Sequence, residues 1–146
     1  MTRSRTAALY TPEVLELAAG LAAFPQDQAL PLAGTARSAA CGSNLALRLA
    51  LGADGTIGAI GISAHACAIG QAAATLFARA ALGRSPAQIA EAEAAVARWL
   101  AGEAPLADWP GLAAIAPAAA WPARHGAILL GWRAALAALS SDGQAR

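Results

Sequence analysis

Residues 40–69 read ACGSNLALRLALGADGTIGAIGISAHACAI, and they contain the clearest strand pattern of the chain. From Leu45 to Leu51, leucines alternate with alanine or arginine, which is the period of two that is typical of a half-buried strand. The turn Gly52–Gly55 follows, and the isoleucine-rich residues Thr56–Ser63 indicate a returning strand. Together the two strands predict a β-hairpin.

Helix signals lie on both sides of this hairpin. Thr11 and Ser85 each precede a proline, and a capping residue followed by proline at the first helical position marks a helix start. Apolar residues at spacings of three and four support the helices that follow Cys67 and Pro122. The predicted helices run from Thr11 to about Ala23, from Cys67 to Gly83, from Ser85 to near Gly102 and from Pro122 to about Leu139.

The other segments are predicted to be loops, with one addition to the sheet. Glu103–Ala120 contains prolines and is predicted to be a long loop with room for one helical turn, and Ser140–Arg146 to be a frayed tail. The segment Gly34–Ala39 is a candidate third strand. The predicted fold is therefore α+β, with a small antiparallel β-sheet packed against about four helices.

The composition excludes several classes of protein. The length of 146 residues suggests a single domain, and 58% hydrophobic against 13% charged residues argues against disorder. With 10 basic and 9 acidic side chains there is no strong basic face, so nucleic acid is not an expected partner. No segment has the roughly 20 strongly apolar residues of a membrane span, and two cysteines are too few for a disulfide scaffold. We therefore expect a cytoplasmic protein with reduced thiols.

Sulfur and imidazole are the reactive groups that the sequence offers. It contains no glycine-rich phosphate loop, no G-x-S-x-G motif and no H-E-x-x-H motif, which leaves Cys41, Cys67, His65 and His125. Because a hairpin brings the start of its first strand close to the end of its second, Cys41 and Cys67 are predicted to be neighbours. Cys67 also lies near a helix N-terminus, where partial positive charge stabilises the thiolate that binds metal or attacks sulfur. His65 shares a face with Cys67 if the strand extends that far.

Simpler interpretations of the same residues stay open. Two cysteines in one domain are often small buried apolar residues, and a histidine at a helix start, such as His125, is typical of a surface or capping position. The tryptophans indicate core anchors, because Trp99 and Trp132 fall on apolar helical stripes. A thiol enzyme would use Cys67 as nucleophile and His65 as base. The sequence supplies neither an orienting third group nor an oxyanion hole for it, so we do not expect an enzyme.

The order of these residues resembles a known family. Ala40-Cys41-Gly42, the leucine-rich strand, Asp54-Gly55, the isoleucine-rich strand and Cys67-Ala68-Ile69 are similar to the IscU/SufU/NifU-N family of iron–sulfur cluster assembly scaffolds. Gly83-Arg84-Ser85 continues the similarity, and Pro122-Ala123-Arg124 followed by Trp132 looks like the closing motif of the SufU branch. The recognisable core covers about residues 35–139 of a single domain, 1–146.

The resemblance implies a metal site at one end of the fold. In the family, three cysteines and an aspartate hold zinc, or a nascent cluster built from iron and from sulfur that a cysteine desulfurase donates. Cys41 and Cys67 match the first two cysteines, whereas Ser43 stands at the position of the aspartate and Ala127 at that of the third cysteine. His125 is displaced by one residue from a histidine found in some members.

Two functions follow from this resemblance. In the first, the protein is a scaffold that binds iron, zinc or a [2Fe–2S] cluster through Cys41 and Cys67, with His65, His125 or both completing the site, and passes the cluster to apo-protein acceptors. In the second, it is a degenerate paralogue that binds no metal and regulates a cysteine desulfurase or the true scaffold by competing for it. The apolar, alanine-rich helices are compatible with a homodimer.

Overall fold

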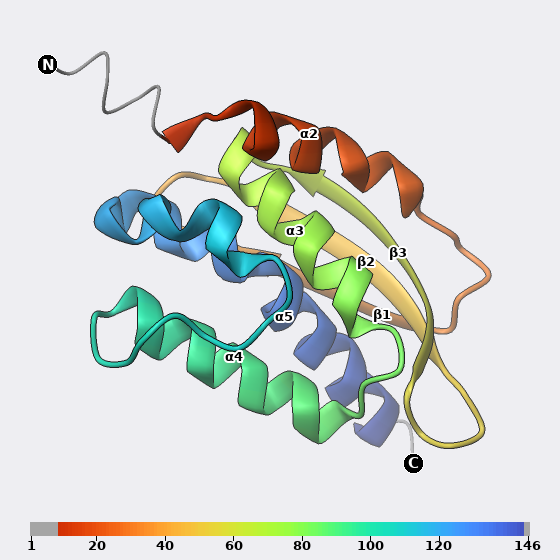
Figure 1. Ribbon diagram of the computed structural model, residues 1–146. Helices are drawn as coiled ribbons and strands as arrows, with labels where there is room; N and C mark the ends of the chain where they lie inside the picture. The colour runs from red at the N-terminus through yellow and green to blue at the C-terminus, as the bar shows by residue number, and fades with distance from the viewer. Residues whose placement is uncertain (1–8, 145–146) are drawn as a thin grey trace, which may run out of the picture.

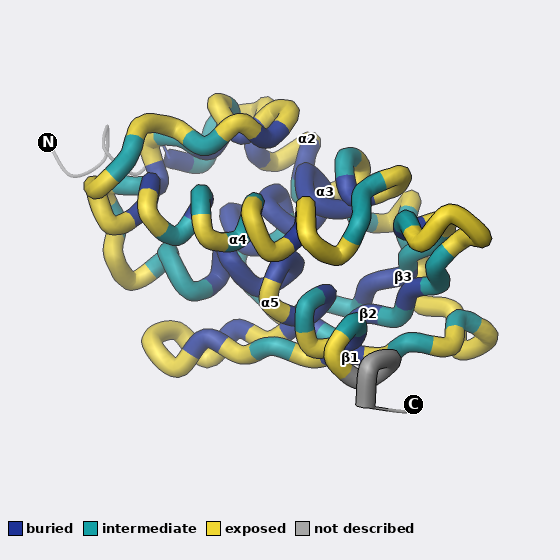
Figure 2. The backbone as a smooth tube through the Cα atoms, turned by 90° about the horizontal axis from the view of Figure 1, so that it is seen from below, coloured by how far each residue is buried: buried dark blue, intermediate teal, exposed yellow. Residues whose placement is uncertain are grey.

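The computed structural model describes residues 9–144, with side chains for residues 9–140, and has the predicted α+β architecture (Figure 1). The helices lie on one side of a three-stranded sheet, and Figure 2 shows the two layers edge-on. The elements in chain order are α2 (Pro12–Gly20), η1 (Leu21–Ala23), β1 (Leu32–Arg37), β2 (Asn44–Leu51), β3 (Ile57–His65), α3 (Ala68–Ala81), α4 (Pro86–Leu100), η2 (Leu112–Ala120) and α5 (Pro122–Gln144).

The predicted hairpin is confirmed and forms the centre and one edge of the sheet. β2 pairs antiparallel with β3, and its other edge pairs antiparallel with β1 in the order β1-β2-β3. The third strand was expected around Gly34–Ala39 and forms at Leu32–Arg37, with Gly34 opposite Leu47. β3 continues two residues beyond the predicted Ser63, so that its last pair joins His65 to Asn44.

The predicted helix starts are confirmed by their caps. The Thr11 hydroxyl accepts a hydrogen bond from the backbone N–H of Val14 at 3.1 Å, which satisfies one free donor of α2. Ser85 and Gln88 form a reciprocal capping box at the start of α4.

Two predictions about irregular segments were wrong. Residues expected to form a loop with one helical turn contain the nine-residue 3₁₀ helix η2. Its buried residues Leu112, Ile115 and Ala118 recur every third position, which is the period of a 3₁₀ helix. The last helix, expected to end at about Leu139, is also longer than predicted, because α5 continues to Gln144. No proline interrupts this end of α5, so nothing in the backbone forces the helix to stop at Ser140.

The core lies between the sheet and the helices. The alternate leucines of β2, Leu45, Leu47 and Leu49, are buried there, as the period of two predicts. The α5 helix lies along β1 and β2 and contacts α3 and α4 as well. It approaches β1 so closely that a methyl group added to Gly34 would overlap the α5 backbone at Ala134 and reach 2.5 Å from the Ala138 nitrogen.

An aromatic cluster closes the core beside α4 and η2. Phe77 stacks on Trp109 at a centroid distance of 5.8 Å, and Trp132 meets both rings edge-on. The buried Trp109 indole donates a hydrogen bond to the Leu76 carbonyl at 2.9 Å. The expectation that Trp99 and Trp132 are core anchors is confirmed, since both are buried. Among the described residues, no helix is long and apolar enough to cross a membrane.

Candidate functional site

The pairing of β2 with β3 brings both cysteine segments to one end of the sheet. Cys41 precedes Asn44 by three residues, Cys67 follows His65 by two, and Asn44 is paired with His65. The turn at Gly52–Gly55 lies at the opposite end of the hairpin (Figure 1). Both thiols are free, with Cys41 exposed and Cys67 half-buried.

Cys41 lies in a tight loop between β1 and β2. The Ser38 N–H donates to the Ser43 carbonyl at 2.8 Å, and the Gly42 N–H donates to the Ser38 carbonyl at 2.9 Å. Gly42 has a φ of 72°, a left-handed conformation that favours glycine. This loop turns the Ser38 and Ser43 hydroxyls toward Cys41, 3.5 and 3.1 Å from its Sγ. Both serines are buried, so their positions are set by packing.

These neighbours hold the pKa of the Cys41 thiol below its ordinary value. The Ser38 hydroxyl is the largest cause, followed by the hydroxyl and the backbone N–H of Ser43, because each donates to the charged sulfur. The positive charge of Arg124, in the first turn of α5, lowers the pKa further, and the slight burial of the sulfur opposes all of these effects. Cys41 is therefore an accessible thiol whose surroundings stabilise the thiolate, which is the nucleophilic and metal-binding form.

Cys67 occupies a different position, as the N-cap residue of α3. The prediction that it lies at a helix N-terminus is confirmed, and its side chain makes no capping hydrogen bond. The Cys67 carbonyl accepts from the Gln71 N–H at 2.9 Å, and its side chain packs against the core. We expected His65 and Cys67 to share a face only if the strand extended to Cys67. β3 ends at the exposed His65, so this condition is not met.

The first turn of α5 brings the third predicted segment to the same end. A methyl group added to Gly126 would overlap Ser38 in the Cys41 loop, and one added to Gly70 in α3 would lie 3.2 Å from Ala127 Cβ. Ala127 is 1% exposed and fills the space beside the α3 N-terminus. His125 is half-buried, and its Nε2 donates to the Ala119 carbonyl at 2.8 Å. In a neutral imidazole this leaves Nδ1 as the nitrogen with a lone pair.

The predicted ligands do not meet as one metal centre. Over the part of the chain that the structure describes, no three side chains of histidine, cysteine, aspartate or glutamate are grouped so that they could hold a metal ion. A four-ligand site from Cys41, Cys67, His65 and His125 therefore requires these side chains to rearrange. The role of Ser38 was not predicted from the sequence. The signal that could have revealed it is a pair of serines around Cys41 in a glycine-containing loop.

Solved structures show what this arrangement is similar to. The chain matches the crystal structure of a nitrogen-fixing NifU-like protein (N-terminal) from Brucella abortus with a TM-score of 0.85 and 25% identity. The match covers 97% of this chain and 99% of that one. The chain has the IscU/SufU/NifU-N fold.

A second structure with the IscU/SufU/NifU-N fold is that of a putative iron–sulfur cluster assembly scaffold protein for the SUF system from Fervidobacterium islandicum AW-1. It matches with a TM-score of 0.80 and 16% identity over 91% of this chain and 98% of that chain. No family model matches the chain, and no curated protein matches it either. The resemblance found in the sequence is thus confirmed at the level of the fold.

Proposed function

We propose that this protein is an iron–sulfur cluster assembly scaffold of the IscU/SufU/NifU-N type, acting in the cytoplasm. Its cargo is iron or a nascent [2Fe–2S] cluster, with zinc as an alternative occupant of the same thiols. The observation that carries the proposal is that Cys41 and Cys67 stand at one end of the sheet on a fold that a NifU-like protein and a SUF-system scaffold share. Its partners are a cysteine desulfurase, which supplies sulfur, and the apo-proteins that receive the cluster.

The chemistry around the two thiols supports cargo binding. Iron and zinc prefer thiolate ligands, and the hydroxyls of Ser38 and Ser43 stabilise the thiolate of Cys41. Because Cys41 is exposed, a desulfurase or an acceptor protein can reach it. In this proposal Cys41 and Cys67 are the two anchoring ligands.

The remaining ligands are the histidines. A [2Fe–2S] cluster or a zinc ion needs four ligands, and imidazole replaces thiolate in some clusters. The exposed His65 is free to turn toward the thiols, and the bond from His125 Nε2 to Ala119 leaves Nδ1 to ligate. Ser43 and Ala127 supply no strong ligand, so we expect the cargo to be held less tightly than by three cysteines and an aspartate.

The test is to measure iron, zinc and acid-labile sulfide in protein purified without oxygen. We expect bound metal in the unmodified chain and none in Cys41→Ser, in Cys67→Ser or in the double variant. Ser63→Ala, a change in β3 that leaves both thiols intact, is the control. His65→Ala and His125→Ala are each expected to weaken zinc affinity. Stoichiometric metal in the double cysteine variant would refute the scaffold proposal.

A second candidate function is a partner-binding paralogue without metal. One observation that favours it is Ala127, which is buried tightly against the α3 N-terminus at the position of a family ligand. The other is that no three histidine, cysteine, aspartate or glutamate side chains among the described residues are grouped so that they could hold a metal ion. Here the protein would bind the desulfurase of its host through this end of the fold. Inhibition of desulfurase activity that persists in the double cysteine variant, together with a metal-free unmodified protein, would favour this function over the scaffold.

A further inference from the structure

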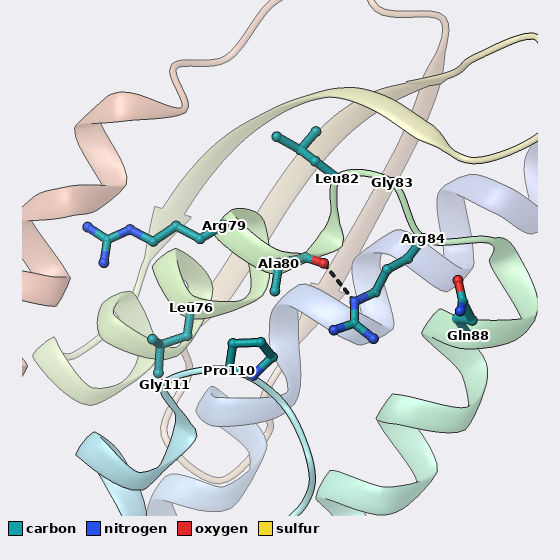
Figure 3. A pocket seen from close by; sticks show the side chains of 9 residues that line it. All are labelled: Leu76, Arg79, Ala80, Leu82, Gly83, Arg84, Gln88, Pro110 and Gly111. Carbon is teal, nitrogen blue, oxygen red and sulfur yellow. Dashed lines mark hydrogen bonds between the residues drawn. The ribbon is translucent and has the colours of Figure 1, made fainter.

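A cavity of about 650 Å³ lies at the C-terminal end of α3, away from the cysteines. Cys67 caps the N-terminus of this 14-residue helix, which is about 20 Å long because each residue adds 1.5 Å, so the cavity and the cysteines lie toward opposite ends of it. The apolar wall of the cavity includes Leu76, Leu82 and Pro110. Figure 3 shows how α3, the loop after it, α4 and the segment before η2 surround it. Its volume is in the range of small-molecule sites.

The polar groups of the cavity carry positive charge. Arg79 and Arg84 line it together with the Gln88 amide, and none of its lining residues is a carboxylate. Glutamates and aspartates do line the two adjoining hollows. Within the described residues, however, neither arginine forms an ion pair with them. The cavity therefore offers the Arg84 guanidinium, whose charge is not neutralised by a direct protein partner, while the Arg79 guanidinium lies against Gly20.

Arg84 is held in place before any ligand arrives. Its Nε donates to the Ala80 carbonyl at 2.7 Å, drawn as the dashed line in Figure 3, and its guanidinium lies 4.2 Å from the centroid of the Trp109 ring. Trp109 is itself fixed by its bond to Leu76. A planar guanidinium fixed in this way keeps its terminal N–H groups for the two-point recognition of a carboxylate or phosphate.

The backbone that carries Arg84 is equally well fixed. The Arg84 carbonyl accepts from the Ile57 N–H at 2.9 Å, and the Gly83 N–H donates to the Ile57 carbonyl at 2.8 Å, so the loop is bonded to the start of β3. Gly83 adopts a φ of 86°, which allows the chain to turn there. A rigid site loses little conformational entropy when it binds a ligand.

We propose that this cavity binds a small organic anion, whose carboxylate or phosphate pairs with Arg84 while its apolar part packs on Leu76 and Pro110. Arg79 lines the cavity with its stem, but its guanidinium points away from Arg84 in Figure 3 and lies beside Gly20 at the end of α2, so Arg84 is the anchoring group. The ligand is thus a free carboxylic acid or phosphate monoester with an apolar body.

The proposal is tested by NMR titration of the full chain with phenyl phosphate, inorganic phosphate and benzyl alcohol. We expect phenyl phosphate to shift the Gly83 and Gly111 amides and the Trp109 indole N–H saturably. Inorganic phosphate should bind more weakly, and benzyl alcohol weakest. The absence of a saturable shift with phenyl phosphate would overturn the proposal. If inorganic phosphate bound as tightly as phenyl phosphate, the apolar part of the ligand would add nothing, and the proposal of an organic ligand would be refuted.

Variants assign the binding to Arg84. Arg84→Gln should weaken phenyl phosphate binding about tenfold or more, because a charge-assisted pair is lost. Arg98→Gln removes the same charge from the exposed face of α4 and should change affinity less than about twofold. Arg84→Lys keeps the charge and the stem, so it tests the planar fork if Arg84→Gln fails to fold. Unchanged affinity in both Arg84 variants would refute the site.

Discussion

The reactivity of Cys41 should depend on the two buried serines beside it. The perturbations are Ser38→Ala, Ser43→Ala and the double variant, all in a Cys67→Ser background so that one thiol reacts. Each single change removes one hydroxyl, 3.5 or 3.1 Å from Sγ, and leaves the Cβ in the packed loop. With a donor lost, the pKa of Cys41 rises toward its ordinary value and less thiolate is present at a pH below it.

The size of the effect follows from the geometry. A hydrogen bond to a charged group contributes about 1.5–3 kcal/mol, and we take about 1 kcal/mol here because Cys41 is exposed to water. That value lowers the thiolate population about fivefold per serine. The more basic thiolate is more nucleophilic, with a Brønsted coefficient near 0.5, which restores about half of the loss on a logarithmic scale. The rate constant should fall about twofold for each single variant and about fivefold for the double variant.

The assay is alkylation by iodoacetamide, followed by mass spectrometry from about pH 5.5 to 9.5, across the range in which a thiol titrates. The rate profiles of the variants should shift to higher pH. At high pH, where every thiol is ionised, the variants should equal or exceed the parent. Ser63→Ala is the matched control and should follow the parent. Superimposable profiles for the parent and the double variant would refute the argument that the serines stabilise the thiolate.

Three further predictions concern stability and metal binding. The depressed pKa of Cys41 means that the folded state binds fewer protons than the unfolded state between the two pKa values. Unfolding free energy should therefore rise with pH there, and the gain should be lost as pH falls through the folded-state pKa. Urea titrations should show this slope in the reduced protein and not in Cys41→Ala. Gly34→Ala should cost about 2–3 kcal/mol because the new methyl meets the α5 backbone, 2.5 Å from the Ala138 nitrogen. Gly58→Ala, whose methyl would meet no atom closer than 3.7 Å, should change stability by less than about 1 kcal/mol in the same titrations. Ala127→Cys should cost about 1–2 kcal/mol through overpacking and yet retain more iron or zinc after anaerobic purification than the parent.

Local signals in the sequence were sufficient for most of the fold. The alternation of leucines in β2 and the proline-led caps of α2 and α4 each report a short-range preference, and each was confirmed. The nine-residue η2 helix was missed because its three-residue period is mixed into an alanine-rich stretch with an internal proline, Pro117, that is usual in loops. The end of α5 was missed because polar residues at a terminus do not by themselves end a helix.

The site was harder to predict than the fold because it depends on the directions of side chains. Hairpin topology was enough to bring the segments of Cys41 and Cys67 to one end of the sheet. It was not enough to orient a histidine. His65 is the last residue of β3 and is exposed, and His125 is bonded to a carbonyl of the segment before it. Ser38 and Ser43 stabilise the Cys41 thiolate because the folded loop places their hydroxyls near its sulfur, and the sequence alone does not show those positions.

The free edges of the small sheet also bear on how the protein behaves at high concentration. β3 is an edge strand, yet other segments hydrogen-bond to its outer side at two places. At its start Ile57 exchanges bonds with Gly83 and Arg84, and further along the Ile62 N–H donates to the Phe24 carbonyl at 2.9 Å. An incoming strand from another molecule has no continuous ladder to join there. The opposite edge, β1, is six residues long and ends in an arginine, and short, charged edges are poor templates for strand addition. The sheet is therefore protected against edge-to-edge aggregation on one side by loops and on the other by brevity and charge.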